Sequence, residues 1–481
     1  MKVLQWLIKL LQSRTTTYKK SLECGECQSE VLVFDAQNLL ICGNGIFEYE
    51  SKADLLQLIE NRGGQKLDSS VQSKHKSNAH KAKTQDSTQN LTQNISQNRL
   101  QDSQQNRLQN RPYRQNSTIR FYDNFHFKDI FGFYHRFFRP FAYRFKALYV
   151  YIFPQSYFYS DSSEIVITHS KKTLISNTSY FHHEFEKPTM TRGFLRELLW
   201  CVKQIYKWLC FYLRKSTFIN GNVAILHQST NYYHFLCESM ASFLQIRAFE
   251  AKTGIKIDFY TLDSTTAFQR QMWEILQIPR SKIIPPQPKK LYKAKNIILP
   301  THIANVEYVE YRDRITWSRA FALPTLLRDF YDEFAFKYLN LKAITPFRKV
   351  FLTRPKDSNR NIINLAEVEE IFRDFGYEVI MPDSLSLMEQ VTLMNESKIV
   401  ASNHGAGLTN VLFMQRGAVV FEIFSEFYFD PGPQIIALLK QMRYAYMAGQ
   451  TADTSPHPQK ECVYINPAQL KIALRKIENL L

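Results

Sequence analysis

Glycine, long apolar runs and the pattern Asp-x-Asp are all scarce or missing in this sequence. Glycine provides only 15 of the 481 residues, less than half of its share of roughly 7% in an average protein. A cluster of glycines therefore indicates a backbone conformation or a close contact that other residues do not allow. No stretch has the roughly 18 consecutive apolar residues of a membrane-spanning helix, so none is predicted. Asp-x-Asp occurs nowhere, so the usual aspartate pair that holds a metal ion against a phosphate is missing, and no metal site is predicted.

The cysteine pattern bears on the compartment. Seven cysteines, an odd number, are scattered from Cys24 to Cys462, which suits a reducing compartment better than a secreted disulfide framework. The opening segment MKVLQWLIKLLQSR is a poor signal peptide, because Lys9 interrupts its apolar run and no small-residue cleavage site follows. We therefore expect a cytoplasmic protein, peripheral on the inner face of the cell membrane if its basic segments contact lipid.

The net charge of +17 is concentrated in the first part of the chain. Residues 1–220 hold 31 basic and 18 acidic side chains, a balance of +13, whereas residues 221–481 hold 30 and 26, a balance of +4. A basic protein can bind nucleic acid, an anionic membrane surface or a polyanionic substrate. Because the later residues are nearly balanced, we expect no nucleic acid partner there. An anionic membrane surface stays open as a partner of the earlier residues.

Three segments precede the regular part of the chain. Residues 1–65 begin with an amphipathic stretch at 1–12, and residues 66–118 form a Gln/Asn/Ser-rich linker that is predicted to be disordered. Residues 119–218 are aromatic and basic, and apolar residues at spacings of three and four predict a helix over 194–215. Each amphipathic segment fits either a helix at a membrane surface or a helix packed on its own domain.

From residue 219 onward, short apolar strands alternate with helices of about ten residues or more. This alternation is typical of parallel sheets with right-handed crossovers. Two such blocks are separated by a helix expected at 323–338. The fold class predicted is therefore α/β, with two Rossmann-like domains at 219–345 and 346–481 that face a cleft, after a partly disordered basic N-terminal region. Ligands of such sheets bind at the carboxyl ends of strands.

The sharpest motif is SNHGAGLTN at residues 402–410. It follows an apolar strand and opens a helix, so its backbone N–H groups and helix dipole suit a phosphate, and His404 could donate a hydrogen bond to it. The alternative is a tight turn with a capping histidine. Arg354 and Arg360 follow the strand at 349–353, where guanidinium groups could bind phosphate oxygens; arginines near a turn are otherwise solvated.

A second candidate motif is NYYHFLCE at residues 231–238. His234 and Glu238 are four residues apart and share one face of a helix. A histidine and a carboxylate that point into a cleft suit a general base for a hydroxyl. An ordinary capping histidine paired with a surface glutamate fits the spacing equally well.

These motifs, together with FLTRPKDSNRNIINLAEVEEIF, LSLMEQVTLM and GAVVFEIF in the same order, resemble glycosyltransferase family 61 over residues 219–450. The resemblance implies a GT-B type fold and a metal-independent, inverting transfer from a nucleotide-diphosphate sugar, with no cofactor. It implies contacts to the diphosphate from Arg354 and His404, an approach allowed by Gly405, Ala406 and Gly407, and support from Arg360, Asn364 and Asn410. It further implies that Glu422 holds the ribose or base and that His234 or Glu238 acts as the base.

The segment after His234 departs from the family. Family members commonly have an aspartate followed by Leu-Pro-Arg-Leu, whereas Glu238 is followed here by Ser-Met-Ala-Ser.

Taken together, the motifs predict a glycosyltransferase that modifies a glycan or glycolipid acceptor in cell-surface polysaccharide or lipopolysaccharide synthesis. The alternatives are a non-catalytic nucleotide- or glycan-binding protein of the same fold and a nucleic-acid-binding protein.

Overall fold

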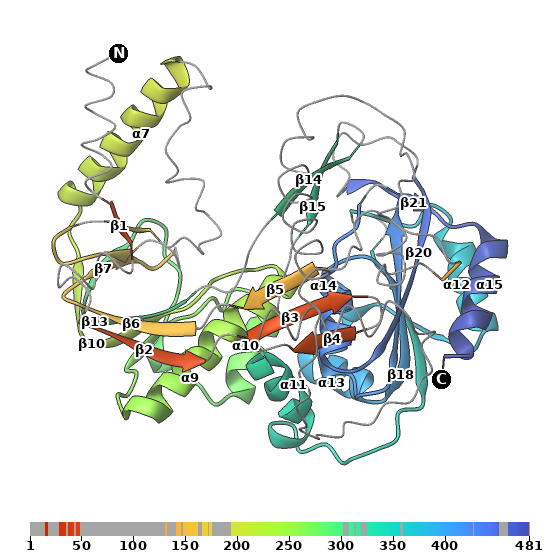
Figure 1. The fold of residues 1–481 in the computed structure, drawn as a ribbon. Helices are drawn as coiled ribbons and strands as arrows, with labels where there is room; N and C mark the ends of the chain where they lie inside the picture. The colour runs from red at the N-terminus through yellow and green to blue at the C-terminus, as the bar shows by residue number, and fades with distance from the viewer. Residues whose placement is uncertain are drawn as a thin grey trace, which may run out of the picture. The chain divides into compact units, whose positions relative to one another are not determined.

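The computed structural model describes residues 15–17, 28–34, 37–42, 45–48, 130–131, 141–145, 148–161, 166–171, 173–175, 194–301, 307–311, 314–318, 325–355, 359–426, 428–451 and 460–480. The helix expected at residues 1–12 and the linker expected at 66–118 lie outside these residues. Within them the fold is a mixture of helices and sheets, as the sequence predicts (Figure 1).

The first large sheet has a parallel centre. Its strands β10 (Thr217–Ile225), β11 (Phe259–Thr261), β12 (Ile283–Ile284) and β13 (Leu291–Pro300) lie in the order β13-β10-β11-β12. From β10 the chain runs outward to β11 and β12 and then returns to β13 on the other side of β10. The switch point therefore lies between β10 and β13, and such sheets bind ligands at a switch point. The connecting helices are α8 (Tyr232–His234), the π-helical turn η2 (Phe235–Ser239), α9 (Met240–Thr253) and α10 (Ala267–Ile275).

Antiparallel strands from the first part of the chain extend this sheet. Strands β6 (Leu148–Pro154) and β7 (Tyr157–Tyr159) pair with β13, and β2 (Ser29–Phe34) pairs with β6. Beyond β7 lie β8 (Val166–Ile167), β9 (Thr173–Ile175) and β1 (Thr15–Thr17). The prediction of a purely parallel sheet is therefore incomplete. Tyrosine and phenylalanine are common in strands, but an aromatic and basic composition does not by itself define a strand, so the sequence did not reveal β6 and β7.

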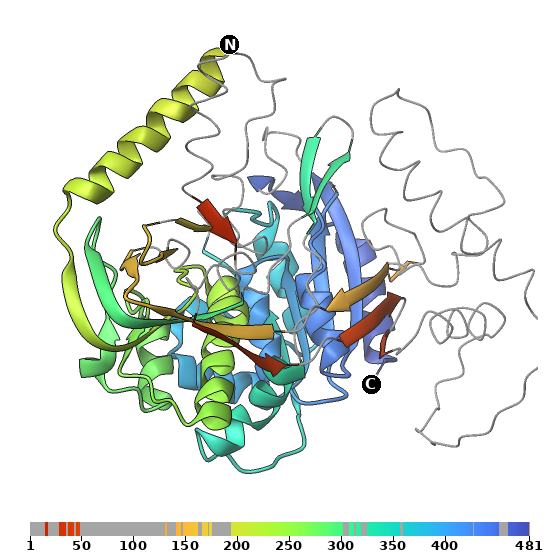
Figure 2. The ribbon, with the colours of Figure 1, turned by 60° about the vertical axis from the view of Figure 1, so that its left-hand side comes forward.

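Helix α7 (Phe194–Leu213) confirms the helix predicted at 194–215 and leads directly into β10. Both ribbon views show it extending away from the end of the first sheet (Figures 1 and 2). A three-stranded sheet is formed by β3 (Gln37–Cys42), β4 (Gly45–Glu48) and β5 (Phe141–Phe145), and β14 (Glu307–Tyr311) and β15 (Arg314–Ser318) form a hairpin.

The second large sheet has the order β17-β16-β18-β19-β20-β21. Its strands are β16 (Arg348–Leu352), β17 (Glu378–Ile380), β18 (Ser397–Asn403), β19 (Val419–Ser425), β20 (Arg443–Thr451) and β21 (Val463–Tyr464). All pairs are parallel except β20 with β21. The chain runs from β16 outward to β17 and then returns to β18 on the other side, so the switch point lies between β16 and β18.

Helices cover both faces of the second sheet (Figure 1). Helices α12 (Leu365–Asp374) and α15 (Pro467–Glu478) pack on one face through a buried apolar cluster that includes Phe351 and Phe372. The other face meets α13 (Leu387–Asn395), α14 (Gly432–Leu439) and the 3-10 helix η5 (Ala406–Phe413). A further buried cluster joins residues of both large sheets and of α11 (Thr325–Lys337), so the two sheets pack together through a shared apolar layer.

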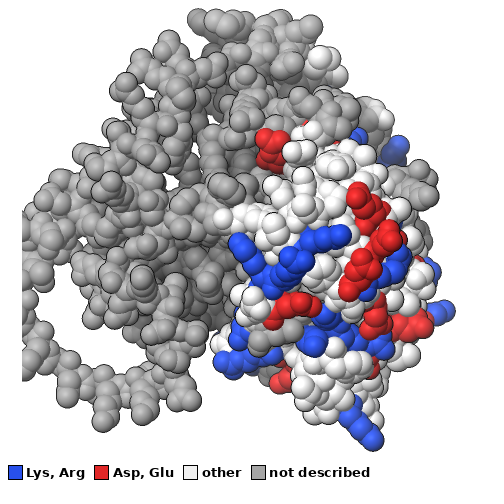
Figure 3. All heavy atoms as spheres, turned by 90° about the vertical axis from the view of Figure 1, so that its right-hand side faces the viewer, with Lys and Arg blue, Asp and Glu red and all other residues white. Residues whose placement is uncertain are grey.

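Acidic and basic side chains are interspersed on the face over α12 and α15 (Figure 3). Several form ion pairs, such as Lys349 with Glu478 at 2.7 Å and Arg373 with Glu369 at 3.0 Å. A nucleic acid site would need a field of one sign, so this face offers no support for one.

Candidate functional site

The switch point of the second sheet brings together residues that are about 50 positions apart in the sequence. Arg354 follows the carboxyl end of β16, and His404 follows the carboxyl end of the adjacent strand β18. Arg360 lies beside them, and its Nε atom donates to the carbonyl oxygen of His404 at 3.1 Å. The strand order therefore brings Arg354, Arg360 and His404 close together.

His404 is held from behind by a buried acid. Its Nδ1 atom lies 2.5 Å from Oε1 of Glu422, which is fully buried on β19. The other carboxyl oxygen of Glu422 accepts a hydrogen bond from the Tyr444 hydroxyl of β20. The strand register places Glu422 opposite Ser402 of β18 and Tyr446 of β20. His404 and Tyr444 are each two residues away from these positions, so they lie on the same side of the sheet as Glu422.

Burial determines the protonation of this pair. It raises the pKa of Glu422 well above its ordinary value, a shift that the Tyr444 hydrogen bond only partly opposes. Burial also lowers the pKa of His404 well below its ordinary value, and the charges of Arg360 and Arg354 lower it further. Both shifts favour the uncharged forms, in which a protonated carboxyl donates to Nδ1 of an uncharged imidazole. The imidazole proton then resides on Nε2, which is a hydrogen-bond donor.

Arg354 lies directly against the glycine of the motif. A Cβ atom placed on Gly405 would fall 1.4 Å from Nη2 of Arg354, so only glycine leaves room for the guanidinium. Nη1 of Arg354 donates to the carbonyl oxygen of Asn359 at 3.0 Å. Partial burial and then the charge of Arg360 lower the pKa of Arg354 to about 10, so it stays charged at neutral pH.

Arg360 is fixed by its backbone and by an aromatic ring. Its φ of 61° is in the left-handed region, which is uncommon for a residue with a side chain. Nδ2 of Asn403 donates to its carbonyl oxygen at 2.6 Å, and its guanidinium lies 5.6 Å from the ring centroid of Tyr428. Tyr428 also packs edge-on against the His404 ring.

The remaining predicted donor-site residues are placed differently. Asn364 exchanges two hydrogen bonds with the backbone of Ile465, at 2.9 and 3.1 Å, and also donates to Glu367. Asn410 accepts from the Tyr232 hydroxyl at 2.6 Å and donates to Gln390 at 2.9 Å. These contacts indicate structural roles for both asparagines. Ala406 and Gly407 form the beginning of η5, where a Cβ atom on Gly407 would come no closer than 3.9 Å to Pro382.

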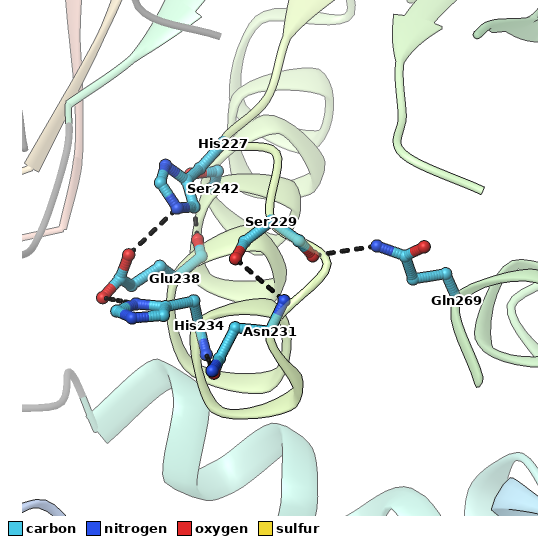
Figure 4. Close-up of polar contacts among 7 residues, drawn as sticks. All are labelled: His227, Ser229, Asn231, His234, Glu238, Ser242 and Gln269. Carbon is cyan, nitrogen blue, oxygen red and sulfur yellow. Dashed lines mark hydrogen bonds and ion pairs between the residues drawn. The ribbon is translucent and has the colours of Figure 1, made fainter. Parts of the chain in front are cut away.

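The first sheet carries a second cluster, shown in Figure 4. Glu238, which is 1% exposed, contacts two histidines. Its Oε1 atom accepts from Nδ1 of His234 at 2.7 Å, and its Oε2 atom lies 3.0 Å from Nε2 of His227. Burial opposes ionisation of Glu238, but the hydrogen bonds from His227 and His234 hold its pKa well below the ordinary value. Glu238 is therefore a carboxylate at neutral pH.

A π-helical turn places the acid between the imidazoles. Residues 235–239 form this turn between α8 and α9, and such turns are rare and frequent at functional sites. Asn231 caps the start by accepting from the backbone N–H of His234 at 3.3 Å. Ser242 donates to the carbonyl oxygen of Glu238, and Gln269 donates to that of Ser229 (Figure 4). The helix expected to carry His234 and Glu238 is present as α8, η2 and α9, but its first turns are not regular.

The two clusters lie on elements that touch each other. Tyr232 of α8 donates to Asn410 of η5, as described above. The next residue, Tyr233, lies so close to Gly432 that a Cβ atom there would be 2.9 Å from the tyrosine hydroxyl. Helix α8 follows β10 and carries His234, while η5 follows β18 and the His404 turn. The His234 cluster and the His404 cluster therefore lie near α8 and η5, two neighbouring helices that follow the carboxyl ends of β10 and β18.

Sequence reasoning missed three residues of these clusters: His227, Tyr428 and Tyr444. His227 lies two residues beyond the carboxyl end of β10, a position that favours functional side chains in parallel sheets. That position was a usable signal. Tyr428 and Tyr444 reach the site through tertiary contacts, which no local pattern indicates. Among the described residues, no group of histidine, cysteine and acidic side chains has the arrangement of a metal site.

Comparison with known proteins agrees with this geometry. Residues 232–421 match the model of the family described as Glycosyltransferase 61. The match begins at Tyr232, one residue after the cap of α8, and ends within β19, so it includes both motifs. No curated protein matches the sequence. The match over residues 232–421 supports a member of glycosyltransferase family 61, and thus a glycosyltransferase.

Proposed function

We propose that this glycosyltransferase uses a nucleotide-diphosphate sugar, whose diphosphate binds at the switch point of the second sheet. The observation that carries the proposal is the convergence of Arg354, Arg360 and His404 at the carboxyl ends of β16 and β18. Guanidinium groups match pairs of phosphate oxygens in geometry and charge. Because the pair of His404 and Glu422 is uncharged overall in its favoured state, the two arginines remain as positive charges for a diphosphate.

The same residues would stabilise the leaving group. Transfer breaks the bond between the anomeric carbon and the diphosphate, so negative charge develops on the departing phosphate oxygen. The arginines and the Nε2–H group of His404 are preorganised donors for that charge. We infer that this positive site replaces a metal ion in the reaction. Glu422 is buried beneath His404, which favours a role in orienting the imidazole over the predicted contact with a ribose or base.

The cluster on the first sheet would activate the acceptor. Because Nδ1–H of His234 donates to the carboxylate of Glu238, the uncharged ring carries its lone pair on Nε2. This nitrogen is suited to accept the proton of an acceptor hydroxyl as its oxygen attacks the anomeric carbon. We therefore assign His234 as the base and Glu238 as the residue that orients it and stabilises the imidazolium. In-line attack from the face opposite the diphosphate inverts the anomeric centre.

The acceptor we propose is a glycan or glycolipid of a cell-surface polysaccharide or lipopolysaccharide, modified in the cytoplasm. The resemblance of the motifs to capsular-polysaccharide biosynthesis proteins supports this class. The sugar, the nucleotide and the linkage need direct measurement.

A panel of nucleotide sugars tests the donor site. The cognate donor should raise the melting temperature of the full-length chain, because a ligand that binds the folded state stabilises it. Arg354→Ala and His404→Ala should lose that shift and the transfer of radiolabelled sugar while remaining folded. Arg348→Ala is the matched control, because Arg348 begins the same strand and binds Glu378 and Glu396 on the opposite edge. Full transfer by the Arg354 and His404 variants would overturn the assignment.

A further inference from the structure

Helix α7 exposes an unusual amount of apolar surface. Eight apolar or aromatic side chains of its 20 residues are exposed, including Leu199 at 60%, Tyr206 at 65% and Leu213 at 76%. We call these eight residues the exposed stripe: Leu198, Leu199, Val202, Ile205, Tyr206, Leu209, Tyr212 and Leu213. Contiguous exposed apolar surface of this kind marks a place of interaction.

The stripe occupies one side of the helix. Residues 198, 202, 205, 209 and 212 follow one another at spacings of four and three, so they share one face. Phe211 lies on another face and is buried, and Cys201, at the margin of the stripe, is buried as well. Phe211 packs edge-on against Tyr157 of β7 with ring centroids 5.5 Å apart, and it joins a small core with Ile167 and Leu291. The end of α7 is thus fixed to the first sheet while the stripe faces outward.

Basic positions lie along one side of the stripe. Positions 196, 203 and 207 are arginine and lysines at spacings of seven and four, which places them along one line of the helix. Glu197 is the single acidic residue within α7. An apolar face bordered by basic positions is typical of helices that lie in the headgroup region of a bilayer.

More basic side chains surround the end of α7 that is fixed to the sheet. Lys171 lies 4.8 Å from the Tyr212 ring, and Arg214 lies 5.9 Å from the Tyr159 ring and donates to the carbonyl oxygen of Lys289. We call the six basic residues of these neighbouring segments the basic collar: Lys171, Arg214, Lys215, Lys289, Lys290 and Lys293. Asp161, which accepts from the backbone N–H of Lys289, is an acidic neighbour.

We propose that α7 is a membrane-binding helix that lies in the plane of an anionic lipid bilayer. The stripe would enter the boundary between headgroups and acyl chains, and the basic collar would contact the lipid phosphates. A helix of 20 residues is about 30 Å long, and none of the described helices is long and apolar enough to cross a bilayer. A second copy of the chain suits the stripe less well, because a symmetric contact would bring two basic collars together.

Vesicle binding by the full-length chain tests the proposal. Sedimentation with vesicles of phosphatidylcholine mixed with phosphatidylglycerol should carry the protein down, and vesicles of phosphatidylcholine alone should bind it at least about tenfold more weakly. High salt should weaken the binding to the mixed vesicles. Equal binding to both vesicle types, or none to either, would overturn the proposal.

Three variants separate the two parts of the surface. Leu199→Gln/Val202→Gln/Leu213→Gln should reduce binding to mixed vesicles by about tenfold or more, and Lys171→Gln/Lys215→Gln/Lys290→Gln should do the same with a smaller salt dependence. The matched control is Phe347→Gln/Met388→Gln/Ile472→Gln, three comparably exposed apolar residues away from α7, which should bind normally. The proposal fails if the control loses as much binding as the stripe variant. It also fails if sedimentation velocity without lipid shows a dimer that the stripe variant dissociates.

Discussion

The guanidinium group of Arg354 occupies the space that a side chain at position 405 would need. A Cβ atom on Gly405 would lie 1.4 Å from Nη2 and 2.4 Å from Cζ of the arginine. The φ of Gly405 is 161°, close to extended backbone that any residue adopts, so space and not backbone freedom requires glycine here. In a chain with so few glycines, this one makes room for a cation.

Gly405→Ala should therefore impair donor use by displacing Arg354. Misplacing a charged group by about 1 Å typically costs on the order of a hundredfold in rate, so kcat/KM for the nucleotide sugar should fall by about that factor. Gly407→Ala should have a smaller effect, since its Cβ atom would meet only Pro382 at 3.9 Å and would leave Arg354 in place. Steady-state kinetics of both variants provide the measurement. Equal kinetics for the two variants would show that the position of Arg354 is unimportant.

Glu422 and Glu238 are both buried and both contact imidazoles, yet their pKa values shift in opposite directions. Burial dominates for Glu422, whose pKa is raised, while the hydrogen bonds from two histidines lower the pKa of Glu238. A raised pKa contributes stability that is complete below the unfolded value of about 4.3 and is lost as the pH rises toward the folded value. A lowered pKa contributes stability that is present above about 4.3 and is lost as the pH falls through the folded value.

Amide substitutions should reveal these opposite signs in urea unfolding. Glu422→Gln should become more stable relative to the wild type as the pH rises from about 4.3 to neutral, by at most about 1.4 kcal/mol per pH unit. Glu238→Gln should be most destabilising at neutral pH, and its deficit should shrink as the pH falls below about 4.3. The free energy of unfolding of each variant, measured across this range, provides the test. Differences with the same sign of slope would contradict the assigned protonation states.

The sequence was most informative about those site residues whose positions follow from the order of the strands. Apolar strands followed by polar residues predicted that Arg354 and His404 would meet, because adjacent parallel strands end at the same edge. Position along the sequence could not reveal that Asn364 binds the backbone of Ile465, about a hundred residues away. It also could not reveal that Asn410 binds Tyr232 across the contact of two helices. The partners of these asparagines are set by tertiary contacts, and a single asparagine in the sequence gives no local sign of its partner.

The last prediction concerns His227, which contacts Glu238 from the end of β10. If Glu238 orients the proposed base His234, removal of the His227 hydrogen bond should raise the pKa of Glu238, because burial then opposes ionisation with less compensation. In His227→Ala, the acid limb of the pH–rate profile should therefore move to higher pH, and kcat should fall by about tenfold or more at neutral pH.

A purely structural role of His227 would change stability without moving this limb. His227→Gln should restore part of kcat, because its side-chain amide can donate to the carboxylate in place of Nε2. The KM for the nucleotide sugar should stay unchanged in both variants, since the donor-binding residues lie on the second sheet. His169→Gln, a change of an exposed histidine, is the matched control. An unshifted acid limb in His227→Ala would remove His227 from the proposed proton pathway and leave Glu238 to be stabilised by His234 alone.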